Sequence, residues 1–518
     1  MPQSRRASFD ENLELVEPSP VNDPIDDGTK RLIQARPVQL RSQAHEVLFI
    51  LICASGSLLT NIAFGNMTVS LLDVQKSLDL DETELPWLQG AYALANGSFV
   101  LVFGGLADSL GAKRVFICGC LWLAIWSLVA GLASSPIQLF VSRAMQGISG
   151  GALVPSGLAL LGYVYEPGRR KNRVFSIYGA AAPIGFIIGA AEAGVCIQVA
   201  NWRWTFYINS ILVTLVAIAA WFSIPPDEHP VGNLRRFDWL GSGVAIAGIV
   251  LVVFGLTDGP VAHWTPYTYG LLIVGVLLLA LFVWIEKKVS DDPVMPLEMW
   301  STPSFGWLMA ATVLGWGGYA CWQFYAGLFW LKVTQASPLL TAAYFSPNAV
   351  FGVVATMVCA STLHILPGHY IFGISGMCFS VGPALFVLLS YKPHLSYWAA
   401  GFPALIFTTF GPDLSFSSAS IFVTSHVKRK YQGSAGSVLN AILQVAMSLA
   451  VGLGGIVESQ VVQARRDPLN PDWQPSLDDV LASYRAVWWF SLALSLASLL
   501  MTLLFVRIEK TSEKKHLA

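Results

Sequence analysis

The chain has 518 residues, of which 54% are hydrophobic and only 12% are charged, against about 25% charged in an average soluble protein. A soluble fold cannot hide that much apolar surface, so the composition excludes an ordinary soluble protein. The net charge of −1 and the placing of the basic clusters between apolar runs also exclude a nucleic-acid-binding chain.

Residues 1–44 are rich in Pro, Asp, Glu, Arg and Ser and have no apolar period. This composition predicts a disordered tail. The first apolar run begins near Val47 and is as long as a membrane span. We therefore expect it to act as the insertion signal itself and not as a cleaved peptide.

Fourteen apolar runs follow the tail, and each is long enough to cross about 30 Å of hydrocarbon as a helix. The predicted fold is therefore all-α and integral to a membrane. The runs cover residues 47–70, 86–106, 115–134, 138–163, 174–198, 204–224, 239–257, 267–286, 304–331, 339–363, 369–390, 396–423, 434–460 and 484–506.

The basic residues are distributed unequally between the connecting segments. If both termini are cytoplasmic, 23 of the 31 Lys and Arg residues fall on the cytoplasmic side, 7 fall outside, and Arg143 lies within a span. The positive-inside rule favours this orientation and an even number of spans. The seven Cys residues all fall in or beside apolar runs, which is typical of buried small side chains.

A short polar run joins the second and third spans. Its charged residues, Asp108, Lys113 and Arg114, must stay at the membrane surface because burying them in hydrocarbon would cost several kcal/mol. The run also resembles the signature loop G-x-L-a-D-r-x-G-r-k of the major facilitator superfamily. The matching positions are Gly104, Leu106, Asp108, Gly111 and Lys113, while Ser109 and Ala112 replace two family arginines.

Two further segments make the resemblance more specific. Residues 143–147, with Arg143, Gln146 and Gly147, match the R-x-x-Q-G motif of the fourteen-span drug:proton antiporters, and residues 202–209 match their W-R-W-x-F-x-I-N segment. Residues 59–65 resemble fungal pumps of the aminotriazole-resistance type. The chain departs from this family in span one, which has no acidic residue before Asp73, and at 189–194, where G-P-x-x-G-G has become Gly-Ala-Ala-Glu-Ala-Gly.

The resemblance implies a major facilitator fold of two six-helix bundles joined by two linker helices. The expected domains are a cytoplasmic tail at 1–44, an N-terminal bundle at 45–224, a linker with two spans at 225–303, a C-terminal bundle at 304–507 and a cytoplasmic tail at 508–518. A substrate site is then expected near mid-membrane, where the bundles meet. Asp108, within the loop from Gly104 to Arg114, is expected to pair with positive charge and a helix end and to stabilise the outward-open state. The alternative is a surface charge cluster of little energetic weight.

Ionisable side chains inside spans are costly, at about 2.5–3.5 kcal/mol each at mid-helix. Arg143, Glu192 and Asp413 are therefore candidates for proton coupling. Arg143 shares one helical face with Gln146. It relays or senses the protonation of a nearby acid or holds an anionic substrate group; the alternative is a fixed ion pair or hydrogen bonds to neighbouring carbonyls. A carboxyl group in an apolar span, as at Glu192, suits the loading and release of a proton, unless it reaches external water. Asp413 follows Pro412, which is expected to interrupt the helix, so the carboxyl either carries protons or satisfies freed backbone groups.

The ninth span places Trp316, Tyr319 and Gln323 at i, i+3 and i+7. They are expected to form an aromatic wall with one polar group, which suits flat amphipathic molecules; the alternative is lipid-facing aromatics. Asn61 in the first span and Gln146 in the fourth are expected to add hydrogen bonds to a substrate.

Together these features predict a secondary transporter that exports small organic molecules, whether drug, toxin or secondary metabolite, by proton antiport with alternating access. The alternative is a proton-independent facilitator or importer of a small nutrient or metal chelate. An enzyme is disfavoured because the sequence lacks H-E-x-x-H and G-x-S-x-G motifs and a histidine cluster within the spans. The sequence implies no cofactor. Movement of two helix bundles against each other needs no second subunit, so we expect a monomer. The resemblance implies a fungal plasma membrane as the location.

Overall fold

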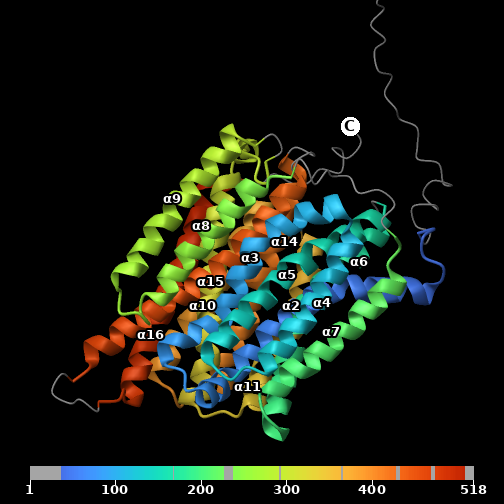
Figure 1. Cartoon of the computed structure of the whole chain (residues 1–518). Coiled ribbons are helices and arrows are strands. Elements are labelled where there is room, and N and C mark those ends of the chain that lie inside the picture. Colours follow the sequence, from blue (N-terminus) through green and yellow to red (C-terminus); the bar gives the residue numbers. More distant parts are fainter. Residues whose placement is uncertain are drawn as a thin grey trace, which may run out of the picture.

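The computed structural model describes residues 37–166, 169–226, 237–290, 293–362, 366–427, 432–467 and 473–507. The regular elements of these residues are helices that run side by side as one bundle (Figure 1). Most of the predicted N-terminal tail and the whole of the C-terminal tail lie outside the described residues. Residues 37–44 form a turn and the first residues of a helix.

Each of the fourteen apolar runs coincides with one helix or with two helices separated by a break. The first eight runs give α2 (Gln43–Leu78), α3 (Leu85–Leu110), α4 (Ala112–Gly131), α5 (Pro136–Val164), α6 (Arg169–Val199), α7 (Arg203–Ser223), α8 (Trp239–Asp258) and α9 (Pro266–Lys288). The others give α10 (Phe305–Leu328), α11 (Pro338–Phe345), α12 (Pro347–Thr362), α13 (Gly368–Tyr391), α14 (Gly401–His426), α15 (Gln432–Arg465) and α16 (Leu477–Phe505). Short helical turns include η1 (Glu82–Glu84) and η3 (Phe329–Val333).

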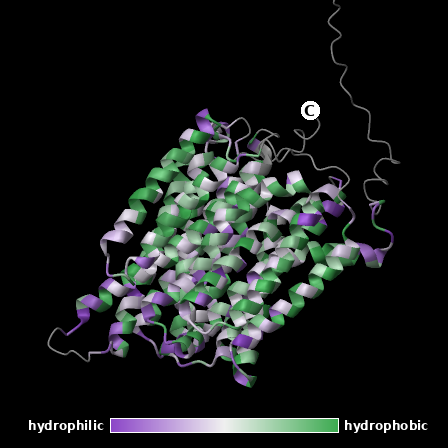
Figure 2. Ribbon diagram, in the orientation of Figure 1, coloured by the Kyte–Doolittle hydropathy of each residue, from purple (hydrophilic) through white to green (hydrophobic). Residues whose placement is uncertain are grey.

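Within the described residues, 12 helical segments are long and apolar enough to cross a membrane. The helices of the ninth and twelfth runs, α10 and α14, are not among these 12 segments, but with 24 and 26 residues they have the length of a membrane span. The prediction of an all-helical membrane fold is confirmed. Figure 2 shows hydrophobic residues along the length of the helices and hydrophilic residues mainly at the two ends of the bundle.

Proline has different effects at two positions. The tenth run is one predicted span but two helices. The first, α11, ends at Phe345, and Pro347 begins α12 after the single residue Ser346; proline cannot donate the backbone hydrogen bond that would join them. At Pro412 α14 continues as one helix, although proline donates no backbone hydrogen bond to the helix ladder. There the Ser415 hydroxyl donates to the Pro412 carbonyl (3.0 Å).

The helices form two groups with matching contacts. In the N-terminal group, α2–α7, α2 contacts α6, α3 contacts α5, and α4 contacts α7. In the C-terminal group, α10–α16, the corresponding pairs are α10 with α15, α12 with α14, and α13 with α16. The groups meet where α3 contacts α15 and where α6 contacts α11 and α12, while α8 and α9 pair with each other and α8 also contacts α3 and α15.

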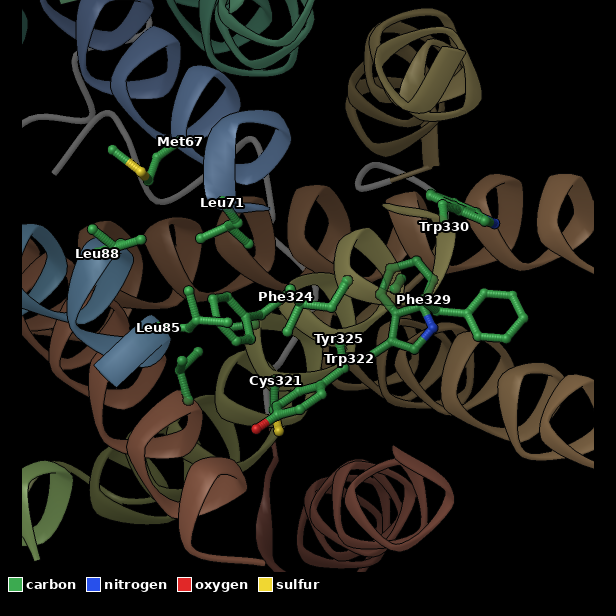
Figure 3. Packing of buried hydrophobic residues seen from close by; sticks show 14 of the residues in the cluster. Met67, Leu71, Leu85, Leu88, Cys321, Trp322, Phe324, Tyr325, Phe329 and Trp330 are labelled. Atoms are coloured by element: carbon green, nitrogen blue, oxygen red, sulfur yellow. The ribbon is translucent and has the colours of Figure 1, made fainter. Parts of the chain in front are cut away.

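The buried hydrophobic residues differ between the two ends of the bundle. Near Glu82, a shared cluster joins both groups: Met67, Leu71 and Leu88 of the N-terminal group pack with Phe324 and Trp330 of the C-terminal group (Figure 3). We call this end the Glu82 end and the opposite one the Asp108 end.

At the Asp108 end the buried residues form two separate clusters. The N-terminal cluster includes Phe116 and Leu153, and the C-terminal cluster includes Phe305 and Phe422. The groups still touch there, because Gly104 of α3 lies beside the Ser437 side chain of α15. The apolar core is therefore continuous across the groups at the Glu82 end and mostly divided at the Asp108 end.

Candidate functional site

Arg143 lies at the centre of the N-terminal group and is 0% exposed. Its Nε donates to the Leu88 carbonyl of α3 (2.9 Å), and Nη2 donates to the Ala63 carbonyl of α2 (3.0 Å). Its Nη1 donates to the side-chain oxygen of Gln146, one turn further along α5 (2.9 Å). The guanidinium therefore joins three helices. The predicted shared face of Arg143 and Gln146 corresponds to a hydrogen bond between them.

An aromatic ring also faces this guanidinium. The Tyr92 ring centroid is 4.8 Å from Cζ of Arg143, close enough for a cation–π interaction. Among the described residues, the groups that hold Arg143 are thus carbonyls, an amide and an aromatic face. A buried cation held by neutral groups responds strongly to any new negative charge nearby, because the interior screens charge poorly.

Gln146 is 2% exposed and lies within the N-terminal group. Its amide nitrogen donates to the Ser127 hydroxyl of α4 (3.1 Å). Gln146 was predicted as a substrate ligand; in this conformation its immediate contacts are Arg143 and Ser127.

Glu192 lies on α6 among small residues, as expected from the sequence. Gly189, one turn earlier, lies so close to α2 that an added Cβ would be 2.2 Å from the Ile62 carbonyl oxygen. The Glu192 carboxyl is half-buried beside the Asn209 side chain of α7. Its buried Oε1 atom has no hydrogen-bond partner among the described residues. The carboxyl thus adjoins the polar interior of the N-terminal group.

Asp413 lies where the two groups meet. A Cβ added to Gly352 of α12 would lie 3.3 Å from Oδ2 of Asp413 and 2.8 Å from Cβ of Pro183 on α6. The carboxyl is also near enough to the Tyr319 phenol of α10 for an electrostatic interaction. Three helices of the C-terminal group and one of the N-terminal group therefore converge on this residue.

The predicted aromatic residues of the ninth span lie beside Asp413. The indole N–H of Trp316 donates to the Ser415 hydroxyl of α14 (2.9 Å). The rings of Trp316 and Tyr319 are 6.2 Å apart in an edge-to-face arrangement, and the Gln323 amide lies near the Tyr319 hydroxyl. All three side chains are half-buried. The structure thus brings this wall and Asp413 together, whereas Arg143 and Gln146 lie inside the other group.

Asn61 lies half-buried on α2. Its amide nitrogen donates to the Ser57 carbonyl on the same helix (2.9 Å). The substrate contact expected for it stays a prediction.

The loop between α3 and α4 turns at Gly111, whose φ of 98° is a backbone conformation that favours glycine. Asp108 is exposed and accepts a hydrogen bond from the Tyr163 hydroxyl of α5 (2.8 Å). The Lys113 ammonium donates to the Trp221 and Ile224 carbonyls at the end of α7 (3.0 and 2.6 Å). In this conformation the loop is thus attached to its own helix group. Gly104, at the start of the predicted loop, lies beside Ser437 of the other group.

Two polar contacts at the Glu82 end were not predicted. Glu82 in η1 forms an ion pair with Lys332 in η3, which links the two groups. The Tyr325 hydroxyl of α10 donates to the carboxyl of Glu458 on α15 (2.7 Å). Glu458 lies two positions before the end of a predicted run, and an ionisable residue inside a run was the signal that could have identified it.

Comparisons with known proteins place the chain among transport proteins. The sequence pattern of the Major Facilitator Superfamily matches residues 53–451. The low affinity ammonium transporter of Saccharomyces cerevisiae is 33% identical over 493 residues, which are 92% of this chain and 92% of that protein. The efflux pump terJ of Aspergillus terreus is 32% identical over 476 residues, 90% of this chain and 89% of the pump.

A further relative and a solved structure agree with these matches. The aminotriazole resistance protein of Saccharomyces cerevisiae is 30% identical over 475 residues, 89% of this chain and 85% of that protein. The crystal structure of the human organic anion transporter MFSD10 superimposes with a TM-score of 0.61 at 13% identity, covering 88% of this chain and 99% of the other. This structural similarity concerns the fold alone.

Proposed function

We propose that this chain, which belongs to the major facilitator superfamily, exports small organic molecules by proton antiport with alternating access. The superfamily consists of multi-pass membrane transporters and not of enzymes. The resemblance found in the hinge loop and in the Arg143 segment is confirmed, as is the fungal branch of drug transporters. Export, proton coupling and the kind of substrate are the proposal.

The observation that carries the proposal is the position of Asp413. Its carboxyl lies where α14, α12 and α6 meet, near enough to the Tyr319 phenol of α10 for an electrostatic interaction. The neighbouring ring of Trp316 donates a hydrogen bond to Ser415, two residues after Asp413. Relative movement of the two helix groups would change the surroundings of a residue at their junction more than those of a residue inside one group. A carboxyl beside aromatic rings can exchange a proton and contact a flat organic molecule at the same place.

Transport by the full chain in liposomes tests the proposal. Labelled aminotriazole is a suitable probe because a relative is named for resistance to it. Liposomes that are acidic inside should accumulate the probe, since protons leaving the lumen would drive it inward. Asp413→Asn and Glu192→Gln should abolish the gradient-dependent uptake.

The control is Asp258→Asn, which changes a carboxylate at the end of α8 that accepts a hydrogen bond from Tyr267. This variant should transport like the wild type. Uptake that ignores the proton gradient and both carboxyl substitutions would contradict antiport.

A second candidate is a facilitator or importer of a small nutrient, and the ammonium transporter relative favours it. The first span has no acidic residue between Glu46 and Asp73, which agrees with proton-independent movement. Isotope-labelled ammonium replaces aminotriazole in the same liposomes. Ammonium uptake that is saturable and independent of the pH gradient, with no aminotriazole uptake, would support this candidate over the exporter.

We further propose that the protein functions as a single copy in the plasma membrane with both chain ends in the cytoplasm. The charge distribution supports this orientation. The Asp108 end then faces the cytoplasm and the Glu82 end faces outward. Labelling of tags at the two ends of the chain in intact cells tests the orientation, which would be wrong if either tag were accessible from outside.

A further inference from the structure

A small cavity lies inside the N-terminal group, beside Arg143. Its volume is about 10 Å³, which is about the space needed by one water molecule. The polar residues that line it are Asn66 of α2, Ser127 of α4, Arg143 and Gln146 of α5 and Asn209 of α7. The remaining lining is apolar and includes Leu59, Leu123 and Phe206. The cavity therefore lies within one helix group and is lined by polar side chains from four helices.

Two acceptor atoms on two walls of this cavity, which α2 and α7 form, need donors. The side-chain oxygens of Asn66 and Asn209 are buried and find no hydrogen-bond partner among the described residues. The two residues are 3% and 7% exposed. A buried polar atom of this kind normally has a partner, because leaving it unpaired costs about 1–3 kcal/mol.

Donors lie on the third wall. Arg143 has five N–H groups, of which three make the hydrogen bonds to Leu88, Ala63 and Gln146. Water can donate to two acceptors and accept from a cation at once. One water molecule is therefore the ligand whose size and hydrogen-bonding capacity both match the cavity.

We propose that this cavity binds one water molecule and that the water couples the protonation of Glu192 to Arg143. The coupling runs from the Glu192 carboxyl to the neighbouring Asn209 side chain, then through the water to the guanidinium. When Glu192 loses its proton, the new negative charge draws the Arg143 guanidinium and weakens its bonds to the Ala63 and Leu88 carbonyls. Those bonds hold α2 and α3 to α5, so the proton state of Glu192 changes how tightly these helices are joined.

Other ionisable groups adjoin this path. Tyr92 of α3 faces Arg143, and Cys196 lies near Glu192 on the same helix. The neighbouring side chains contributed by α2, α4 and α7 are Asn66, Ser127, Thr205 and Asn209, which are neutral. Glu192 is therefore the acid of this path, and the inference rests on the proton coupling proposed above.

Infrared difference spectroscopy of the full chain in liposomes, between acidic and alkaline buffer, tests the inference without a transported substrate. The wild type should show a carboxyl band that is lost in Glu192→Gln. With it should appear an O–H band of bound water that shifts in water enriched in heavy oxygen. Asn66→Leu and Asn209→Leu fill the cavity with apolar atoms, so they should lose the water band while the carboxyl band remains.

The control is Asn440→Leu, at an asparagine of α15 that donates to the Gly436 carbonyl outside this cavity; it should keep both bands. Size-exclusion profiles and helical circular dichroism identify variants that fail to fold. A wild type without the water band, or a water band that survives both cavity-filling variants, overturns the inference. If the two bands change together but aminotriazole transport ignores the proton gradient, the proposed antiport fails while the water site stands.

Discussion

The two ends of the helix bundle hold the N-terminal and C-terminal groups together in different ways. At the Glu82 end a single hydrophobic cluster crosses the boundary, and the Glu82–Lys332 ion pair lies over it. At the Asp108 end each group has its own cluster, and the hinge loop contacts α5 and α7 of its own group. The structure is therefore a conformation packed at the Glu82 end.

This difference explains the contacts of Asp108. The family resemblance implies that Asp108 pairs with positive charge in the outward-open state. In the orientation proposed above, the Glu82 end would be separated in that state. Here that end is packed, and the Asp108 carboxylate accepts a hydrogen bond from the Tyr163 hydroxyl. The expected pair therefore concerns another conformation and stays a prediction. The reactivity of two native cysteines can measure how tightly each end is packed. Cys321 belongs to the shared cluster at the Glu82 end, and Cys120 belongs to the N-terminal cluster at the Asp108 end.

Phe345→Ala should have the largest effect. Phe345 is 0% exposed. The centroid of its ring is 5.5 Å from that of Phe186 in the N-terminal group and 4.8 Å from that of Trp330 in the C-terminal group. Its removal should cost about 3–5 kcal/mol and should loosen the Glu82 end. Maleimide labelling of Cys321, read by peptide mass spectrometry, should accelerate at least tenfold, since about 1.4 kcal/mol already gives a factor of ten.

The matched control for this change is Phe422→Ala, in the C-terminal cluster at the Asp108 end. Phe422 is equally buried, so the loss of thermal stability should be similar. Labelling of Cys321 should stay near the wild-type rate. Equal acceleration by both variants would mean that the shared cluster does not close the Glu82 end.

Tyr325→Phe should have the next largest effect. The substitution removes the hydroxyl that donates to the Glu458 carboxyl and leaves this half-buried carboxyl without that partner, at a cost of about 1–3 kcal/mol. The thermal unfolding midpoint should fall. Tyr178→Phe removes a hydrogen bond to the Val154 carbonyl in the N-terminal group and should lower the midpoint less. The reverse order would show that the Glu458 carboxyl finds another donor.

Reversing the charge of Lys332 should have a smaller effect on stability. Both partners of the pair are partly exposed, with side chains 28% and 40% accessible, so an opposite-charge contact there contributes about 1 kcal/mol or less. Lys332→Glu places two acidic groups together across the boundary and should increase Cys321 labelling several-fold. The double exchange, Glu82→Lys with Lys332→Glu, should restore the wild-type rate.

A second ion pair at the same end provides the control. Arg465 and Asp479 (3.2 Å) join α15 to α16 within the C-terminal group. Arg465→Glu should therefore leave Cys321 labelling unchanged. Faster labelling of Cys321 in Arg465→Glu would mean that the Lys332→Glu effect comes from general charge repulsion and not from the boundary between the groups.

The fold could be read from the sequence because fourteen apolar runs are long enough to span a membrane and each became a helix or a broken helix. The break at Pro347 was visible in principle, whereas the continuation of α14 through Pro412 could not be inferred from the residue types alone. The pairing of Arg143 with Gln146 followed from helical spacing. The other ligands of Arg143 are backbone carbonyls of α2 and α3, and Glu82 and Lys332 are 250 residues apart, so tertiary packing alone brings them together.

The smallest effect is expected at the Asp108 end, from Tyr163→Phe. The hydroxyl donates one hydrogen bond to an exposed carboxylate, and water can replace it at little cost, so stability should fall by about 0.5 kcal/mol or less. Labelling of Cys321 and Cys120 should not change, because the bond joins α3 to α5 within one group. If Asp108 has its main role in the outward-open state, Asp108→Asn should abolish transport with the protein still in the membrane. Equal transport by wild type and Asp108→Asn would remove the gating role of this loop and leave the shared cluster as the main determinant of which end is closed.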